Sequence, residues 1–156
     1  MVSQESAFPA ELDEIYQEVI LDHYRNPRNK GKLPQADLSS RGFNPFCGDE
    51  VVLEMKLSPE GRVETSRFTG QGCSISQASA SMLTQLVKRK SLDQAHELSE
   101  LFRSVMQGHA LTGEEAEQVG ELEALQGVRK FPIRIKCALL AWATLDDAIK
   151  EYKAKR

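Results

Sequence analysis

Two spacings of apolar residues predict the secondary structure of this chain. Between residues 12 and 24, apolar and aromatic side chains recur at helical spacing, which predicts an amphipathic helix that ends near residue 26. Apolar residues alternate with polar ones at 51–57 and again at 62–69, and the short turn between these runs predicts an antiparallel hairpin. A weaker pattern at 37–43 predicts a short edge strand.

Helical spacing returns after the hairpin and predicts three further helices. The first runs to about residue 90, and we expect Ser74 or Ser76 to cap its start. A capping box at Ser91 opens the second, and Pro132 suits the first turn of the third. The residues expected on the buried face of this last helix are Ile133, Cys137, Leu140, Ala141, Thr144, Leu145, Ala148, Ile149 and Tyr152.

A polar and charged segment at 109–128 separates the last two of these helices. A capping box at Thr112 opens a short acidic helix within it, and the helical pattern then fades through residues 120–127. Such a composition is typical of an insertion between core helices. Since the length suits one domain, we predict a single domain over residues 1–156 with an insertion at about 109–128.

The composition narrows the class of protein. Hydrophobic residues make up 40% and charged residues 28% of the 156 residues, and the net charge is −3. This balance is ordinary for a soluble globular protein and disfavours a basic nucleic-acid-binding face, so we expect a protein partner. The N-terminus has no basic region followed by an apolar run, and no stretch approaches the roughly 20 apolar residues that span a bilayer. We therefore expect a cytoplasmic protein that binds neither nucleic acid nor membrane.

The sequence NPFCGD at 44–49 carries the candidate chemistry. Cys47 and Asp49 flank a glycine that can take backbone angles closed to other residues, so both side chains can point at one spot. The predicted hairpin brings this turn beside Cys73, and the last helix carries Cys137 in its first turns. Three thiolates and one carboxylate would complete a tetrahedral metal site. The predicted ligands are Cys47, Asp49, Cys73 and Cys137.

Other roles are open for these residues and their neighbours. An isolated cysteine in a reducing compartment is more often a packed core residue than a ligand. Cys73, however, is expected at the N-terminal end of a helix, which favours a thiolate over a thiol. Arg134 lies three residues before Cys137, where stabilising an anionic site and forming a surface salt bridge are equally consistent with the sequence. His23 falls on an apolar stripe, which is typical of a hydrogen-bonded packing residue, so we leave it out of the site.

Three cysteine motifs occur in order along the chain. They are NPFCGD at 44–49, GQGCSIS at 70–76 and RIKCALLAW at 134–142. Together they resemble the SufU branch of the IscU/NifU-like iron–sulfur cluster assembly family over nearly the whole chain. The resemblance implies an α+β fold, in which a small antiparallel three-stranded sheet packs against several helices.

The resemblance also implies a function. Members of the SufU branch are zinc-bound proteins that take sulfur from a pyridoxal-phosphate cysteine desulfurase, whereas the classical scaffold branch builds a labile 2Fe-2S cluster. Lys136 stands where the scaffold branch carries a histidine, and the segment at 109–128 is extra, so we favour a zinc-dependent sulfurtransferase. A 2Fe-2S scaffold that passes its cluster to apo-proteins is the alternative, and a purely structural zinc domain is a third possibility. Downstream iron–sulfur assembly proteins are the other expected partners.

Within this function, Cys47 is the expected acceptor of the persulfide sulfur. It lies on the flexible glycine turn, whereas Cys73 and Cys137 are tied to helix starts, so Cys47 is the thiol best able to swing out to a donor. Asp49 is then the ligand expected to yield, because a carboxylate is the hard, exchangeable member of a thiolate-rich set. Arg134 would steady the charge left on the site.

Overall fold

The computed structural model describes residues 14–155, with side chains from residue 16 onward. The start of the predicted first helix, before residue 14, lies outside this range. The elements are α1 (Glu14–Arg25), β1 (Leu38–Asn44), β2 (Asp49–Leu57), β3 (Val63–Gln71), α2 (Ser74–Leu86), α3 (Leu92–Met106), α4 (Gly113–Val119), the 3-10 helix η2 (Gly120–Lys130) and α5 (Pro132–Ala154).

The three strands form one antiparallel sheet in the order β1-β2-β3. The predicted hairpin is confirmed as β2 and β3, and the predicted edge strand is β1. In β2 every second residue from Asp49 to Met55 is buried, as the period of two predicts. Asn44 pairs with Asp49 at one end of the sheet, and Glu50 pairs with Gln71 beside it. The turn at 45–48 and the end of β3 therefore meet at the same corner.

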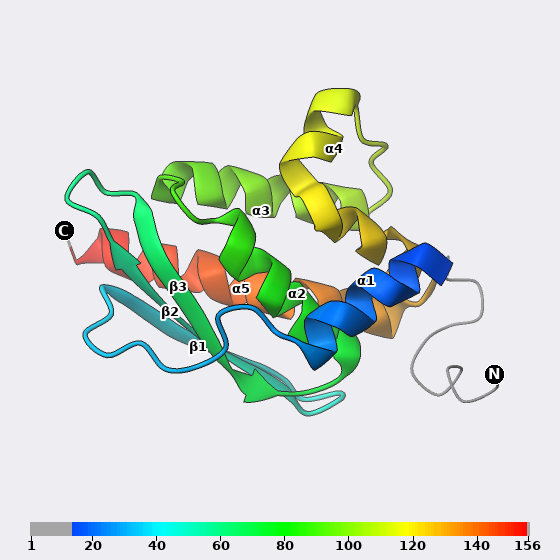
Figure 1. The fold of residues 1–156 in the computed structure, drawn as a ribbon, viewed down its shortest axis with the longest axis horizontal. Coiled ribbons are helices and arrows are strands. Elements are labelled where there is room, and N and C mark those ends of the chain that lie inside the picture. The colour runs from blue at the N-terminus through cyan, green and yellow to red at the C-terminus, as the bar shows by residue number, and fades with distance from the viewer. Residues whose placement is uncertain (1–13, 156) are drawn as a thin grey trace.

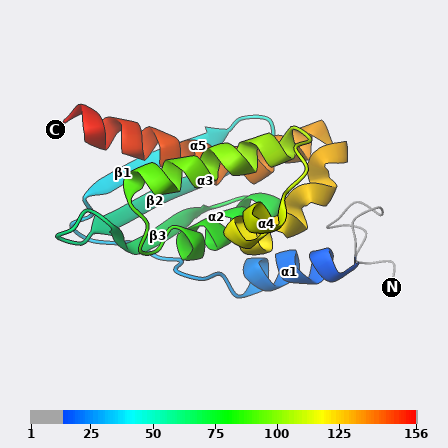
Figure 2. The same ribbon diagram turned by 90° about the horizontal axis from the view of Figure 1, so that it is seen from above.

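Helices cover one face of this sheet, as Figures 1 and 2 show. Helix α5 packs against β1 and β2, α2 packs against β3 and α5, and α1 packs against α2. Trp142 of α5 is fully buried, and its Nε1 donates to Ser79 Oγ at 3.2 Å. Ser79 Oγ in turn donates to the carbonyl of Ala138 at 2.7 Å, so a buried hydrogen-bond chain joins α2 to α5. The predicted α+β fold is confirmed.

Three sequence-based expectations for the helices are wrong. Helix α2 ends at Leu86 rather than near residue 90. Its N-cap is Cys73, and no side chain caps it; Ser76 Oγ donates instead to the carbonyl of Cys73 at 3.2 Å. Ile133 is 64% exposed although it was expected on the buried face of α5, because the first turn of that helix extends beyond the sheet and leaves it uncovered.

The end of the 109–128 segment contributes to the core, which its polar composition did not predict. Val119, Leu122, Leu125 and Val128 are all buried. They recur every three residues, which is the period of a 3-10 helix and gives one apolar stripe along η2. Because these residues are spaced by three rather than by 3.6, the α-helical pattern in the sequence weakens over this segment. The description of 109–128 as an insertion stays a prediction.

His23 is a buried packing residue, as its place on the apolar stripe of α1 predicted. Its Nε2 donates to Glu121 Oε1 at 2.6 Å, and its Nδ1 lies 2.7 Å from Ser81 Oγ. The histidine thus ties α1 to α2 and to η2. Among the described helices, none is both long and apolar enough to cross a membrane.

The stripe on η2 yields a prediction about stability. Leu125→Ala should lower the free energy of unfolding by about 2–5 kcal/mol, because it opens a cavity beneath a fully buried side chain. Urea denaturation followed by circular dichroism measures the change. Gln118→Ala, at an exposed position of α4, is the control and should change it by less than about 0.5 kcal/mol. Equal midpoints for the two variants would mean that η2 is not part of the cooperative core.

Candidate metal centre

The turn that carries Cys47 is closed by Asn44, the last residue of β1. Asn44 is buried, its carbonyl accepts the N–H of Gly48 at 2.8 Å, and its Oδ1 accepts the N–H of Phe46 at 3.1 Å. Its Nδ2 donates to Cys47 Sγ at 3.1 Å. Gly48 has a φ of +72°, a region that favours glycine, which allows the chain to reverse between the thiol and Asp49.

Asp49 begins β2 and is only 1% exposed. Its Oδ1 accepts the backbone N–H of Cys73 at 2.9 Å, and its Oδ2 lies 3.2 Å from Cys47 Sγ and 3.6 Å from Cys73 Sγ. Gly72 makes this approach possible, since a Cβ at that position would overlap Asp49 Oδ1. The carboxylate therefore joins the turn, the start of β2 and the start of α2.

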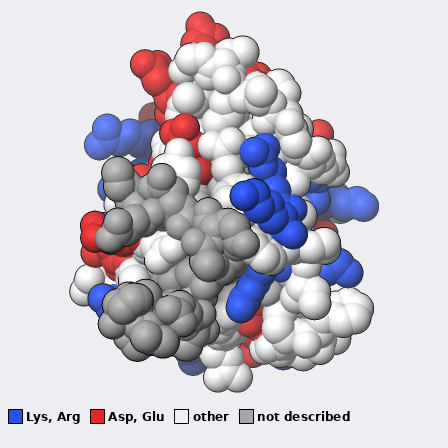
Figure 3. All heavy atoms as spheres, turned by 90° about the vertical axis from the view of Figure 1, so that its right-hand side faces the viewer, with Lys and Arg blue, Asp and Glu red and all other residues white. Residues whose placement is uncertain are grey.

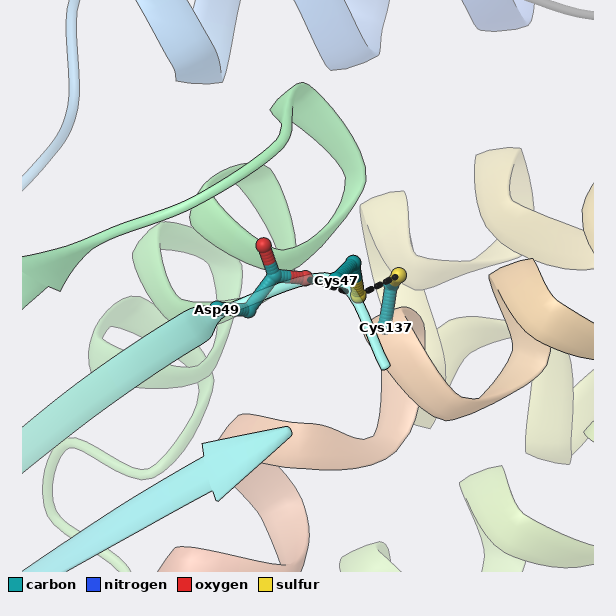
Figure 4. Close-up of side chains that lie close together, drawn as sticks. All are labelled: Cys47, Asp49 and Cys137. Atoms are coloured by element: carbon teal, nitrogen blue, oxygen red, sulfur yellow. Dashed lines mark hydrogen bonds between the residues drawn. The ribbon is translucent and has the colours of Figure 1, made fainter. Parts of the chain in front are cut away.

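Cys137 reaches the same corner from α5. Its buried Sγ lies 3.4 Å from Cys47 Sγ, and Figure 4 shows the two thiols and Asp49 side by side. One ligand atom from each of these three residues lies within 4.8 Å of the other two. Cys73 falls outside that tight group but contacts it through Asp49. All four predicted side chains thus meet at one corner of the sheet.

The donor set fits a thiophilic cation. Tetrahedral Zn²⁺ geometry separates two sulfur ligands by about 3.8 Å and a sulfur from an oxygen ligand by about 3.6 Å. The contacts of 3.4, 3.2 and 3.6 Å between these side chains are close to those separations. Within the described residues, Asp49 forms no ion pair with Lys, Arg or His. A buried carboxylate without a cation is costly, and a metal ion would supply that charge.

The three thiols differ in acidity without a metal. The nearby Cys137 thiol lowers the pKa of Cys73 to about 6, against the effect of burial, and N–H groups in the first turn of α2 add to the lowering. The neighbouring Cys73 thiol and burial raise the pKa of Cys137. Burial and the neighbouring Asp49 raise the pKa of Cys47. The lowered pKa agrees with the thiolate predicted at the start of α2, but its main cause is the neighbouring Cys137 thiol rather than the helix end.

Basic residues surround the start of α5. Figure 3 views this end of the molecule and shows Lys and Arg side chains gathered there. Lys130 and Lys136 are exposed and Arg134 is half-buried, one turn before Cys137. In the described part of the chain no hydrogen bond or ion pair of the Arg134 side chain is present, so its role at the site stays a prediction.

Two contacts at the site were missed by the sequence reasoning. One is the Asn44 amide on Cys47 Sγ; the Asn-Pro start of the motif signals a turn closed by an asparagine side chain. The other is Lys136, whose Nζ lies 4.5 Å from the centre of the Phe46 ring. No sequence pattern pairs these two residues, which are 90 positions apart.

Comparisons with known proteins agree with this geometry. The model of the NifU-like N-terminal domain family matches residues 15–137. The chain is 48% identical to the zinc-dependent sulfurtransferase SufU of Bacillus subtilis, covering 92% of this chain and 95% of that protein. It is 40% identical to the iron–sulfur cluster assembly scaffold protein IscU of Streptococcus pyogenes, covering 90% and 86% of the two chains.

A solved structure is also similar. It is that of a proposed iron–sulfur cluster assembly scaffold protein for the SUF system from Fervidobacterium islandicum, with a TM-score of 0.78 and 30% identity. The match covers 85% of this chain and 94% of that one.

The acidities predict how the thiols of the metal-free protein react. Because the pKa of Cys73 is about 6, its thiolate forms above that pH, and its alkylation rate should rise through a midpoint near pH 6. The pKa of Cys47 is raised by desolvation of its thiol and by the neighbouring Asp49, so Cys47 should react only in more alkaline solution than Cys73. Alkylation with neutral iodoacetamide after chelation, mapped by mass spectrometry over a pH series, measures both midpoints. Modification of Cys47 at a lower pH than Cys73 would contradict this order.

Proposed function

The chain belongs to the family of NifU-like N-terminal domains, as its cysteine motifs indicated, and from that premise we propose that it is a zinc-dependent sulfur acceptor. In this role it takes persulfide sulfur from a pyridoxal-phosphate cysteine desulfurase during iron–sulfur cluster assembly. The observation that carries the proposal is the buried Asp49, which contacts two thiols and has no cationic side chain beside it among the described residues.

The residues that would hold zinc are Cys47, Asp49, Cys73 and Cys137. When bound, the metal ion supplies the positive charge that keeps the thiols deprotonated at neutral pH. In the metal-free protein the pKa of Cys47 is raised, which favours the protonated thiol. Since a protonated thiol is a poor nucleophile, the reactivity of Cys47 would depend on the bound metal. The SufU of Bacillus subtilis, named a zinc-dependent sulfurtransferase, supports the same assignment.

Cys47 would receive the sulfur. It is exposed, whereas Cys137 is buried and Cys73 is only partly exposed. Its thiolate attacks the terminal sulfur of the desulfurase persulfide, and a new S–S bond forms at Cys47 Sγ as the donor S–S bond breaks. The electron pair leaves with the desulfurase cysteine as a thiolate, so no oxidant or reductant is consumed. Asn44 Nδ2 already donates to Cys47 Sγ and would stabilise the attacking thiolate.

The second candidate is a scaffold for a 2Fe-2S cluster, favoured by the 40% identity to an IscU scaffold protein. Thiolates suit iron as well as zinc, so the same four residues would hold the cluster. Anaerobic reconstitution with iron and sulfide separates the two functions. A stable cluster spectrum, transfer of that cluster to an apo-ferredoxin and weak zinc affinity would together establish the scaffold.

Partners follow from the same proposal. The sulfur donor is a cysteine desulfurase, and the recipients are downstream iron–sulfur assembly proteins. We assign Arg134 an auxiliary role, which is to steady negative charge near Cys137 from one turn away on α5. This role is separable from metal binding, since Arg134 supplies no ligand atom.

Zinc content provides the first test. Protein purified without added metal should carry about one zinc ion per chain, and Asp49→Ala should lower that content and the melting temperature. Chelation should lower the melting temperature of the wild type in the same direction, since metal binding adds to folding free energy. Elemental analysis and thermal unfolding measure these changes. Glu50→Ala, the neighbouring residue of β2, is the control and should retain its zinc. Wild-type zinc content in Asp49→Ala would remove this residue from the ligand set.

Sulfur mapping provides the second test. After incubation with a cysteine desulfurase and cysteine, mass spectrometry should find the added sulfur on Cys47. Cys47→Ser should abolish both this sulfur and the stimulation of desulfurase turnover. Sulfur on Cys73 or Cys137 in the Cys47→Ser protein, together with retained stimulation, would show that another thiol is the acceptor.

A further inference from the structure

Phe46 is an unusual residue for the position beside the proposed sulfur acceptor. Its side chain is 74% exposed, although it is large and apolar. It directly precedes Cys47 in the turn, so its ring moves whenever the turn moves. The ring is not without a partner, because Lys136 Nζ lies 4.5 Å from its centre, within the range of a cation–π interaction.

This contact joins the same two segments as the contact between two candidate ligands, Cys47 and Cys137. Lys136 directly precedes Cys137, just as Phe46 directly precedes Cys47. The Phe46–Lys136 pair therefore bridges the same two segments as the two thiols, whose Sγ atoms are 3.4 Å apart. Because both contacts join the turn to α5, a backbone movement at Gly48 that carries residues 46–47 away from α5 would break both of them.

A cavity open to solvent lies beside this contact. Its volume is about 310 Å³, and it is lined mainly by apolar side chains from the turn and from α5. Among its lining residues are Phe43, Pro45, Phe46, Lys136, Leu139 and Ala143. Phe46 and Lys136 both line this cavity, and their contact joins the turn to α5 at its edge.

We propose that Phe46 and Lys136 form a latch, which holds the Cys47 turn against α5 and opens when the turn moves toward the sulfur donor. Both are positioning residues, since neither contacts the transferred sulfur in the closed arrangement. The part of the latch in sulfur transfer rests on the proposed function, whereas the latch itself rests on the contact, the cavity and the hinge. An exposed cation–π contact of ordinary strength would hold the open population down about two- to fivefold.

The test measures how often Cys47 becomes accessible. Neutral iodoacetamide is added to the zinc-loaded full chain at one pH, and the alkylation rate of Cys47 is followed by mass spectrometry. Phe46→Leu removes the ring but keeps an apolar side chain, and it should raise the rate about two- to fivefold. Phe46→Tyr and Lys136→Arg keep a ring and a cation, so both should retain the wild-type rate. Phe43→Leu is the matched control, because this exposed ring lines the same cavity, whereas the cation–π contact of Lys136 is with Phe46; this variant should leave the rate unchanged.

A double-mutant cycle shows whether the two residues act together. Lys136→Met removes the charge, and combining it with Phe46→Leu should add no further acceleration to that of Phe46→Leu alone. An unchanged rate in Phe46→Leu, the same acceleration in Phe43→Leu, or additive effects in the double variant would each overturn the latch. If these results hold but the wild type takes no sulfur at Cys47, the latch stands and the proposed sulfur transfer fails.

Discussion

The structure of the site depends on burying one carboxylate at the corner of the sheet. Asp49 is almost fully buried and accepts the N–H of Cys73, the N-cap of α2. It can come so close only because Gly72 has no side chain. This single residue therefore fixes the start of α2 relative to the first residue of β2. A buried charge needs compensation, and the three thiols around it have no positive charge to offer, so a bound cation would stabilise this corner of the fold.

Two of the three cysteines lie in or directly before packed helices, and the third lies on a turn. Cys137 and Cys73 belong to helices α5 and α2, and these helices are locked together by the buried chain from Trp142 through Ser79 to the Ala138 carbonyl. Cys47 lies instead on a turn held by Asn44 and hinged at Gly48. A site built in this way can keep two of its thiols fixed while the third moves, which is what an acceptor that must meet an external donor requires.

Much of this arrangement could be predicted from the sequence, because it follows from local periods and from hairpin geometry. The period of two at 51–57 and 62–69 fixed the hairpin, and the hairpin placed Asp49 beside Cys73. What could not be predicted depends on tertiary packing. The stripe at Val119, Leu122, Leu125 and Val128 has a period of three, which a search for α-helical spacing discounts. The exposure of Ile133 depends on where the sheet ends beneath α5, and this cannot be predicted from the local sequence pattern.

The acidity of the thiols shows a further limit of reasoning from sequence, and it bears on the chemistry. A helix N-terminus does favour a thiolate at Cys73, yet the larger effect on its pKa comes from the thiol of Cys137, a residue 64 positions away. The pKa of Cys73 is lowered while those of Cys137 and Cys47 are raised, so in the metal-free protein the thiolate forms first at Cys73 and not at the exposed Cys47. Among the described residues, the side chains that hydrogen-bond to Cys47 Sγ are Asn44, Asp49 and Cys137, and none of them carries positive charge. A bound cation would supply that charge to a nucleophile at Cys47. In the proposed function, metal binding and sulfur acceptance would therefore be coupled, since the cation that stabilises the buried Asp49 would also bring Cys47 to its reactive form.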